Sequence, residues 1–130
     1  MAFTAFLFTG CGAFFGACLR YAFGIVLNPV FPTIPLGTLA ANLLGGLIIG
    51  VMMALIAQFQ ALSPELRLFV VTGFLGGLTT FSAFSAETVT LLLRREYVWV
   101  LGIIGAHLIG SLLMTLLGFF LVQTIARIWT

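Results

Sequence analysis

The sequence predicts an all-α integral membrane protein with four transmembrane helices. Of its 130 residues 62% are apolar and only 6% are charged, and the mean hydropathy is +1.30. Soluble domains carry about 25% charged residues, so a chain this poor in charge is typical of a protein whose solvent is lipid. The apolar residues form continuous runs without the alternation of a β-barrel, which favours helices.

Polar and proline-containing segments divide the apolar sequence into four runs. The divisions are the prolines of segment 28–35, the polar segment 63–67 and the pair of arginines at 94–95. The predicted spans are residues 3–27, 36–58, 66–93 and 97–127. Each span reaches the ~20 residues that cross a hydrocarbon core. Residues 1–130 therefore form a single predicted membrane domain, and an even number of spans puts both termini on one side.

The basic residues give almost no orientation preference. Arg67 and Arg127 lie on the predicted side of the termini, whereas Arg94, Arg95 and the more distant Arg20 lie on the other side. Cytoplasmic loops normally carry an excess of basic residues, and two against three is no clear excess. Identical chains could therefore insert both ways and pair as an antiparallel homodimer.

Glycines at GxxxG spacing occur three times, and this spacing lets helix backbones approach closely in lipid. The pairs are Gly12 with Gly16, Gly46 with Gly50, and Gly73 with Gly77. Four helices leave little room for an enclosed aqueous path of their own. The pattern therefore predicts tight helix packing and favours an oligomer.

Polar side chains inside the spans are the candidate functional residues, because an unpaired polar group is costly in lipid. Thr38 and Asn42 lie four residues apart and share a face of the second span. Asn42 fits either a pore lining or a hydrogen bond between helices. The fourth span carries His107, Ser111 and Thr115 on one face. A single histidine is usually a structural hydrogen bonder, but hydroxyls in line with it are typical of a pathway wall.

The third span contains a glycine- and threonine-rich segment that predicts a broken helix near mid-membrane. Gly73, Gly76 and Gly77 each cost a helix about 1 kcal/mol relative to alanine, and Thr79 and Thr80 add β-branched crowding. Breaks at membrane depth are tolerated where the freed backbone groups are buried or line a cavity. Freed carbonyls could hold a cation and freed amides an anion, although a kink for packing alone is the alternative.

The residues after this segment add aromatic and hydroxyl faces. Phe81 and Phe84 share one face of the helix, and Ser82 and Ser85 share another. The phenylalanines either fill space or present their positive ring edges to an anion. Glu87 is the one carboxyl group inside a span and fits a proton carrier, a hydrogen-bond partner or an interfacial residue. Apart from Glu87 these groups are neutral and mostly donors, which favours a small hydrated anion over a cation.

The sequence gives little support to other classes of function. It has no metal-binding Cys/His spacing, no phosphate-binding loop and no nucleophile–base pair, so we expect no enzyme. Its charge is too sparse for nucleic acid. Two alternatives remain open at this point, a small proton-coupled multidrug exporter that would have to use Glu87, and a non-transporting membrane assembly subunit.

Three motifs resemble those of the CrcB/Fluc family of fluoride channels. They are Gly16-Ala17-Cys18-Leu19-Arg20-Tyr21, Gly37-Thr38-Leu39-Ala40-Ala41-Asn42, and the segment from Gly73 to Ser85 with Gly76-Gly77-Leu78-Thr79-Thr80-Phe81 at its centre. The third motif is highly specific. Chain length, number of spans and motif order are also similar to the family over essentially the whole chain.

The resemblance implies an antiparallel dual-topology homodimer with two fluoride pores in the cell (inner) membrane. Such a channel passively exports the fluoride that accumulates in the cytoplasm in acid surroundings. The family holds a structural Na⁺ at the dimer centre by main-chain carbonyls, and Gly76 and Thr79 match that role. Asn42 would line the pore, with Phe81 and Phe84 as ring-edge ligands.

The resemblance also implies a polar track beside the pore, with Ser82, Ser85 and Glu87 along it and Arg20 near the aqueous vestibule. From the residues alone, Arg20 could instead reach the lipid headgroups or supply positive potential at an anion entrance. The family commonly has a threonine where this chain has Ala83, so one hydroxyl of the track is missing.

Overall fold

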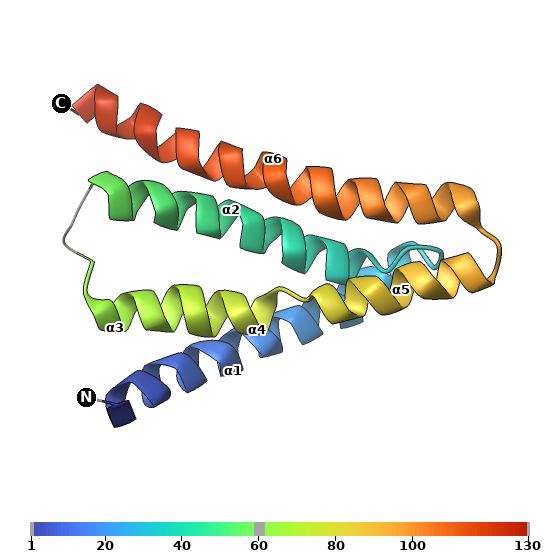
Figure 1. Ribbon diagram of the computed structural model, residues 1–130, viewed down its shortest axis with the longest axis horizontal. Coiled ribbons are helices and arrows are strands. Elements are labelled where there is room, and N and C mark those ends of the chain that lie inside the picture. The colour runs from blue at the N-terminus through green and yellow to red at the C-terminus, as the bar shows by residue number, and fades with distance from the viewer. Residues whose placement is uncertain (1, 59–61, 130) are drawn as a thin grey trace.

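The computed structural model describes residues 2–58 and 62–129, which form helices joined by short connections. Four helical segments are long and apolar enough to cross a membrane: Phe3–Val30, Leu36–Gln58, Pro64–Leu93 and Tyr97–Ile128. They form an elongated bundle, and both ends of the chain lie at the same end of it (Figure 1). The predicted all-α fold with four possible spans is confirmed.

The first two spans are joined through a short 3₁₀ helix, η1. In chain order the elements are α1 (Ala2–Leu27), η1 (Asn28–Val30), α2 (Leu36–Gln58), α3 (Pro64–Arg67), η2 (Leu68–Leu75), α4 (Gly76–Leu78), α5 (Phe81–Leu93) and α6 (Tyr97–Trp129). Asn28 links η1 to the start of α2, because its Oδ1 accepts a hydrogen bond of 2.8 Å from the N–H of Gly37. This bond satisfies one of the amides that a helix N-terminus leaves free.

The third span is built from several pieces. Ser63 caps the start of α3 by accepting from the N–H of Leu66, and the chain then continues through η2, an eight-residue π-helix that the sequence did not predict. Helical backbone ends at Leu78 and resumes at Phe81. Between them Thr79 (φ −80°, ψ 152°) and Thr80 (φ −151°, ψ 118°) are extended.

The two threonines close the helix ends on either side of them. The hydroxyl of Thr79 donates to the carbonyl of Leu75 at 2.8 Å, and its N–H donates to the same oxygen at 2.9 Å. The hydroxyl of Thr80 accepts from the N–H of Ala83 at 3.2 Å and so caps α5. Threonine is well suited to both tasks, because its hydroxyl can bond a nearby backbone group.

The glycine pairs of α1 and of the third span pack on each other within the chain. A Cβ atom on Gly12 would lie 2.8 Å from the nitrogen of Phe74, and one on Gly16 would lie 2.7 Å from the nitrogen of Leu78. A Cβ on Gly73 would in turn lie 3.0 Å from the Cα of Gly12. Side chains are absent where the two backbones meet, which allows the close approach that the spacing predicts.

The remaining pair, Gly46 and Gly50, allows the same close approach between the backbones of α2 and α6. A Cβ atom on Gly46 would lie 2.8 Å from the carbonyl oxygen of Ser111, and one on Gly50 would overlap the backbone at Thr115. The predicted tight packing is therefore present. Because all three pairs are occupied inside one chain, the spacing no longer supports an oligomer by itself.

The turn between α5 and α6 contains a left-handed residue, Arg95, with φ 61°. The N–H of Arg95 donates to the carbonyl of Leu92 at 3.0 Å, and the N–H of Glu96 donates to that of Leu91 at 3.0 Å. This pair of bonds is the Schellman motif, in which glycine normally takes the left-handed position. The arginine therefore pays a conformational cost that glycine would avoid.

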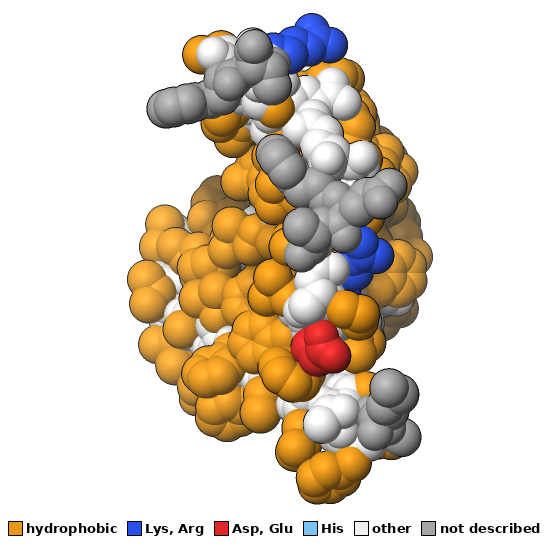
Figure 2. All heavy atoms as spheres, turned by 90° about the vertical axis from the view of Figure 1, so that its left-hand side faces the viewer, with side chains coloured by type: hydrophobic (Ala, Val, Ile, Leu, Met, Phe, Trp, Pro, Cys, Tyr) orange, Lys and Arg blue, Asp and Glu red, His pale blue; other side chains and the backbone are white. Residues whose placement is uncertain are grey.

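Most large apolar side chains face outward. Phe6 is 77% exposed and Leu101 is 73% exposed, whereas one small cluster of buried residues consists of Ala41, Leu75 and Leu78. Apolar side chains also cover most of the surface seen from the end of the bundle in Figure 2. This inverted distribution is what a lipid solvent requires of a four-helix chain.

Candidate functional site

A groove of about 550 Å³ lies where the second, third and fourth spans meet. It collects most of the residues that the sequence proposed for the pore and for Na⁺. These are Asn42, Gly76, Thr79, Phe81, Phe84, His107, Ser111 and Thr115. Arg20, Ser82, Ser85 and Glu87 do not line it.

Asn42 sits at the centre of a hydrogen-bond cluster that joins three spans. Its Oδ1 accepts from the N–H of Thr80 at 2.8 Å, and its Nδ2 donates to the carbonyl of Thr80 at 3.0 Å. The same Nδ2 lies 3.0 Å from Nδ1 of His107. Asn42 thus lines the groove and also bonds other spans, so its two possible roles are compatible.

Three aromatic rings follow one another along the groove. Phe81 and Phe84 meet edge to face, with ring centroids 5.5 Å apart and planes at 63°. Phe84 lies against the ring of His107, with centroids 4.7 Å apart. Phe84 and His107 are packed, but Phe81 is 79% exposed, so within one chain nothing covers the outermost ring.

The hydroxyl groups predicted to line the pore differ in their positions and in their hydrogen bonds. Ser111 and Thr115 line the groove, but the hydroxyl of Thr115 donates to the carbonyl of Ser111 at 2.9 Å. Its hydrogen is therefore engaged within α6. Ser82 lies at the start of α5 with its hydroxyl 3.2 Å from that of Thr80, and Ser85 is exposed. The structure does not bring these two serines into the groove.

Glu87 is bound to the second span rather than directed into the groove. One carboxylate oxygen, Oε1, accepts a hydrogen bond of 2.5 Å from the hydroxyl of Thr38. The other, Oε2, is buried and has no hydrogen-bond partner among the described residues. Of the three roles open to Glu87, the structure shows the hydrogen-bond partner. Thr38 lies four residues before Asn42 on the same face of α2, and this spacing could have identified it as a site residue from the sequence.

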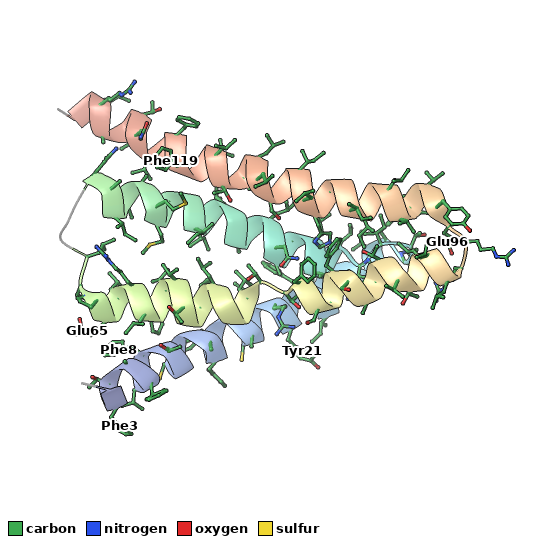
Figure 3. The ribbon with its side chains drawn as sticks, viewed as in Figure 1. Phe3, Phe8, Tyr21, Glu65, Glu96 and Phe119 are labelled. Atoms are coloured by element: carbon green, nitrogen blue, oxygen red, sulfur yellow. The ribbon has the colours of Figure 1, made fainter. Side chains whose placement is uncertain are left out.

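Arg20 lines a second cavity, of about 520 Å³, on the other side of the interruption. Its Nε donates to the carbonyl of Gly77 at 3.0 Å, so part of the guanidinium satisfies a helix C-terminus. Tyr21, next in the chain, is 73% exposed and points away from the bundle (Figure 3). Thr80 lines both cavities and therefore stands between them. The sequence offered only its hydroxyl as a signal for that position.

Comparison with known proteins identifies the family of this chain. Residues 7–119 match the family model described as CrcB-like protein, Camphor Resistance (CrcB). The chain belongs to the CrcB family. This confirms the family that the three sequence motifs predicted.

The curated relatives of the CrcB chain are similar to it over nearly their whole length. The fluoride-specific ion channel FluC of Nitrosospira multiformis is 60% identical over 118 residues, which cover 91% of this chain and 92% of the relative. The FluC channel of Thiobacillus denitrificans is 56% identical over 119 residues (90% and 94%). That of Aromatoleum aromaticum is 56% identical over 115 residues (88% of each). These relatives are named as channels and not as enzymes.

The backbone of the CrcB chain frees carbonyl oxygens beside the groove. The N–H of Thr80 would bond the carbonyl of Gly76 in a continuous α-helix, but here it bonds Asn42. No atom of the described residues lies within 4 Å of a Cβ placed on Gly76, so this position faces open space among them. Among the described residues no three His, Cys, Asp or Glu side chains gather to hold a metal ion. Main-chain oxygens suit a hard cation such as Na⁺ and need no such side chains.

Proposed function

We propose that this CrcB chain forms a passive, fluoride-selective channel in the cell (inner) membrane, through which cytoplasmic fluoride leaves and its toxicity is relieved. The observation that carries the proposal is the groove between three spans, lined by neutral donors, aromatic rings and apolar side chains. Among the described residues, those that line it include no carboxylate, arginine or lysine. The ion is inferred from the relatives, which are named fluoride-specific ion channels.

Fluoride would enter the groove by exchanging its waters for several weak partners. The hydroxyl of Ser111 and the positive edges of Phe81 and Phe84 would share the ion between them, with Asn42 lining the path beside them. Conduction needs sites that are strong enough to admit an ion and weak enough to release it. Larger anions would be excluded by the width of the path and by the lack of a fixed cation to offset their dehydration.

We propose that two chains pair in antiparallel orientation and enclose two pores. Phe81 is 79% exposed in the single chain although it borders the groove, so one chain leaves the proposed path open on a side. A second copy could cover it. Both chain ends lie at one end of the bundle, and the arginines are nearly balanced between its ends, which permits insertion both ways up.

A structural Na⁺ at the centre of this dimer is part of the proposal. Gly76 and Thr79 would hold the ion through their main-chain carbonyls, with the same two oxygens from the second copy. The support is the open position of Gly76 and the diversion of its usual hydrogen-bond donor to Asn42. The ion would tie the two interrupted spans together by neutralising inward-pointing carbonyl dipoles.

The test is anion efflux from liposomes that hold the purified protein, with fluoride and chloride electrodes in parallel and no imposed proton gradient. Fast release of fluoride with chloride retained is expected. Equal release of both ions would contradict selectivity, and no release of either would contradict the channel. Release that requires a proton gradient would instead indicate a coupled transporter. Protein-free liposomes and liposomes with heat-inactivated protein are the controls.

A further inference from the structure

The backbone of Thr80 fixes which end of the Asn42 carboxamide carries the oxygen. A peptide N–H can only donate and a peptide carbonyl can only accept a hydrogen bond. The atom 2.8 Å from the N–H of Thr80 must therefore be Oδ1, and the atom 3.0 Å from its carbonyl must be Nδ2. An asparagine amide is ambiguous in many sites, but here its two contacts leave one assignment.

This orientation in turn decides where the proton of His107 lies. Nδ2 of Asn42 carries two hydrogens, of which one is donated to Thr80, and the other points toward Nδ1 of His107 at 3.0 Å. Nδ1 must therefore accept, which puts the proton of the neutral ring on Nε2. The ring is only 5% exposed and lies against Phe84, so packing holds it in this place.

We propose that His107 is a positioning residue of the channel. Its Nδ1 takes the second amide hydrogen of Asn42 and thereby holds the carboxamide in the one orientation that bonds both backbone groups of Thr80. With no acceptor at this point, Asn42 would keep a buried hydrogen unpaired and could turn to find another partner. That turn would break both bonds to the interruption between α4 and α5.

The proposal deepens the proposed function, because it names what keeps a groove residue in place. It differs from the view that His107 merely lines the path. Nε2, the nitrogen that bears the proton, is buried and has no hydrogen-bond partner among the described residues. The imidazole makes its hydrogen bond with Asn42 through the other nitrogen, Nδ1.

The first experiment reads the tautomer directly and needs no ion flux. His107 is the single histidine of the chain, so protein grown with ¹⁵N-histidine gives one imidazole in solid-state NMR spectra of proteoliposomes. At neutral pH we expect a hydrogen-bonded, unprotonated Nδ1 and a protonated Nε2. In Asn42→Leu the Nδ1 resonance should move toward that of a free nitrogen. A protonated Nδ1 in the wild-type protein would overturn the proposal.

The second experiment compares two substitutions by fluoride efflux. His107→Asn places an amide oxygen near the position of Nδ1, whereas His107→Leu keeps an apolar side chain of similar size without an acceptor. We expect the leucine variant to lose about tenfold in flux and the asparagine variant to stay within about threefold of wild type. Leu101→Ala, at a 73% exposed position of the same helix, is the control and should be unchanged.

Equal losses in both His107 variants would overturn the proposal, because packing alone would then explain the residue. Thermal unfolding in detergent gives a readout for variants that carry no flux. His107→Leu should lower the melting temperature of the wild-type protein but change little in an Asn42→Ala background, since its effect runs through Asn42. If the wild-type protein itself passed no fluoride, the proposed function would fail, and the NMR result would still decide the role of His107.

Discussion

Phe81 and Phe84 show how two like residues one helical turn apart take different parts in the site. Phe84 is packed against the ring of His107, and it belongs to the apolar contacts of the bundle. Phe81 touches Phe84 by an edge and otherwise faces outward, with 79% of its side chain exposed. Replacing Phe81 should therefore disturb the proposed ion path more than the fold of the chain.

Phe81→Ile should slow fluoride efflux by about fivefold while the protein stays folded and assembled. The reason is the loss of a ring edge, whose electrostatic contribution is about 1 kcal/mol. Efflux from liposomes measures the rate, and size-exclusion chromatography in detergent measures assembly. Phe6→Ile, at a 77% exposed position of α1, is the matched control. Wild-type rates in both variants would remove Phe81 from the path.

Arg95 gives a prediction about stability. A φ of 61° is unfavourable for a residue with a Cβ atom but not for glycine. Arg95→Gly should therefore raise the free energy of unfolding by about 1 kcal/mol. Arg94, the neighbouring residue, has φ −78° and serves as the comparison. Arg94→Gly should be neutral or destabilising. Denaturant titration of the purified protein would test both, and equal effects would contradict the conformational argument.

At the scale of elements, the sequence predicted the number and kind of segments better than their internal geometry. Continuous apolar runs and prolines are local signals, and four candidate spans follow from them. The exact interruption at Thr79–Thr80 depends on partners far along the chain, since Arg20 bonds the end of α4 and Asn42 bonds Thr80. No local pattern marks such contacts, and the π-helical geometry of η2 has no sequence signal either.

In the candidate site, too, local patterns in the sequence predicted some features, whereas packing between distant residues determined the others. The spacing of polar residues predicted that His107, Ser111 and Thr115 share one face of α6, because helical periodicity is a local property, and all three line the groove with Asn42. Whether a side chain faces the groove or a neighbouring helix depends on packing. Glu87 therefore bonds Thr38 outside the groove, which its position in the sequence did not reveal.

The close approach of α1 to the third span can be tested with two glycines of α1. A Cβ on Gly16 would overlap the backbone of Phe74, whereas no other described residue has an atom within 4 Å of one on Gly10. Gly16→Ala should lower the free energy of unfolding by about 1–3 kcal/mol through overpacking. Gly10→Ala should be neutral or raise it by about 1 kcal/mol, because alanine is the better helix former. Similar effects of both changes would mean that the two helices are not in backbone contact.

Over the whole molecule, the features that concern assembly are the open groove, the exposed Phe81 and the balance of charge between the two ends. None of them identifies a partner by its own surface chemistry, because many large apolar side chains are exposed and the face seen in Figure 2 is mostly apolar. The glycine faces are used inside the chain. The antiparallel homodimer therefore remains a prediction, supported by the incomplete enclosure of the groove and by the arginines.

A tag at the C-terminus should be reached from both faces of the membrane if the chain inserts both ways up. Labelling with a membrane-impermeant reagent, in intact cells and in inverted vesicles, measures the two populations. We expect comparable signals, because the basic residues favour neither orientation. A tag found on one face alone would exclude the antiparallel pair. A single-orientation membrane protein with the same tag controls for leaky membranes.

The three-way contact of Asn42 with Thr80 and His107 also has a consequence for the order of folding. During synthesis Asn42 emerges first, Thr80 follows in the third span, and His107 comes last, in α6. A nascent chain that ends before residue 107 can therefore bond Asn42 to Thr80 but cannot complete the cluster. The cluster would be complete only after the last helix had entered the membrane and docked.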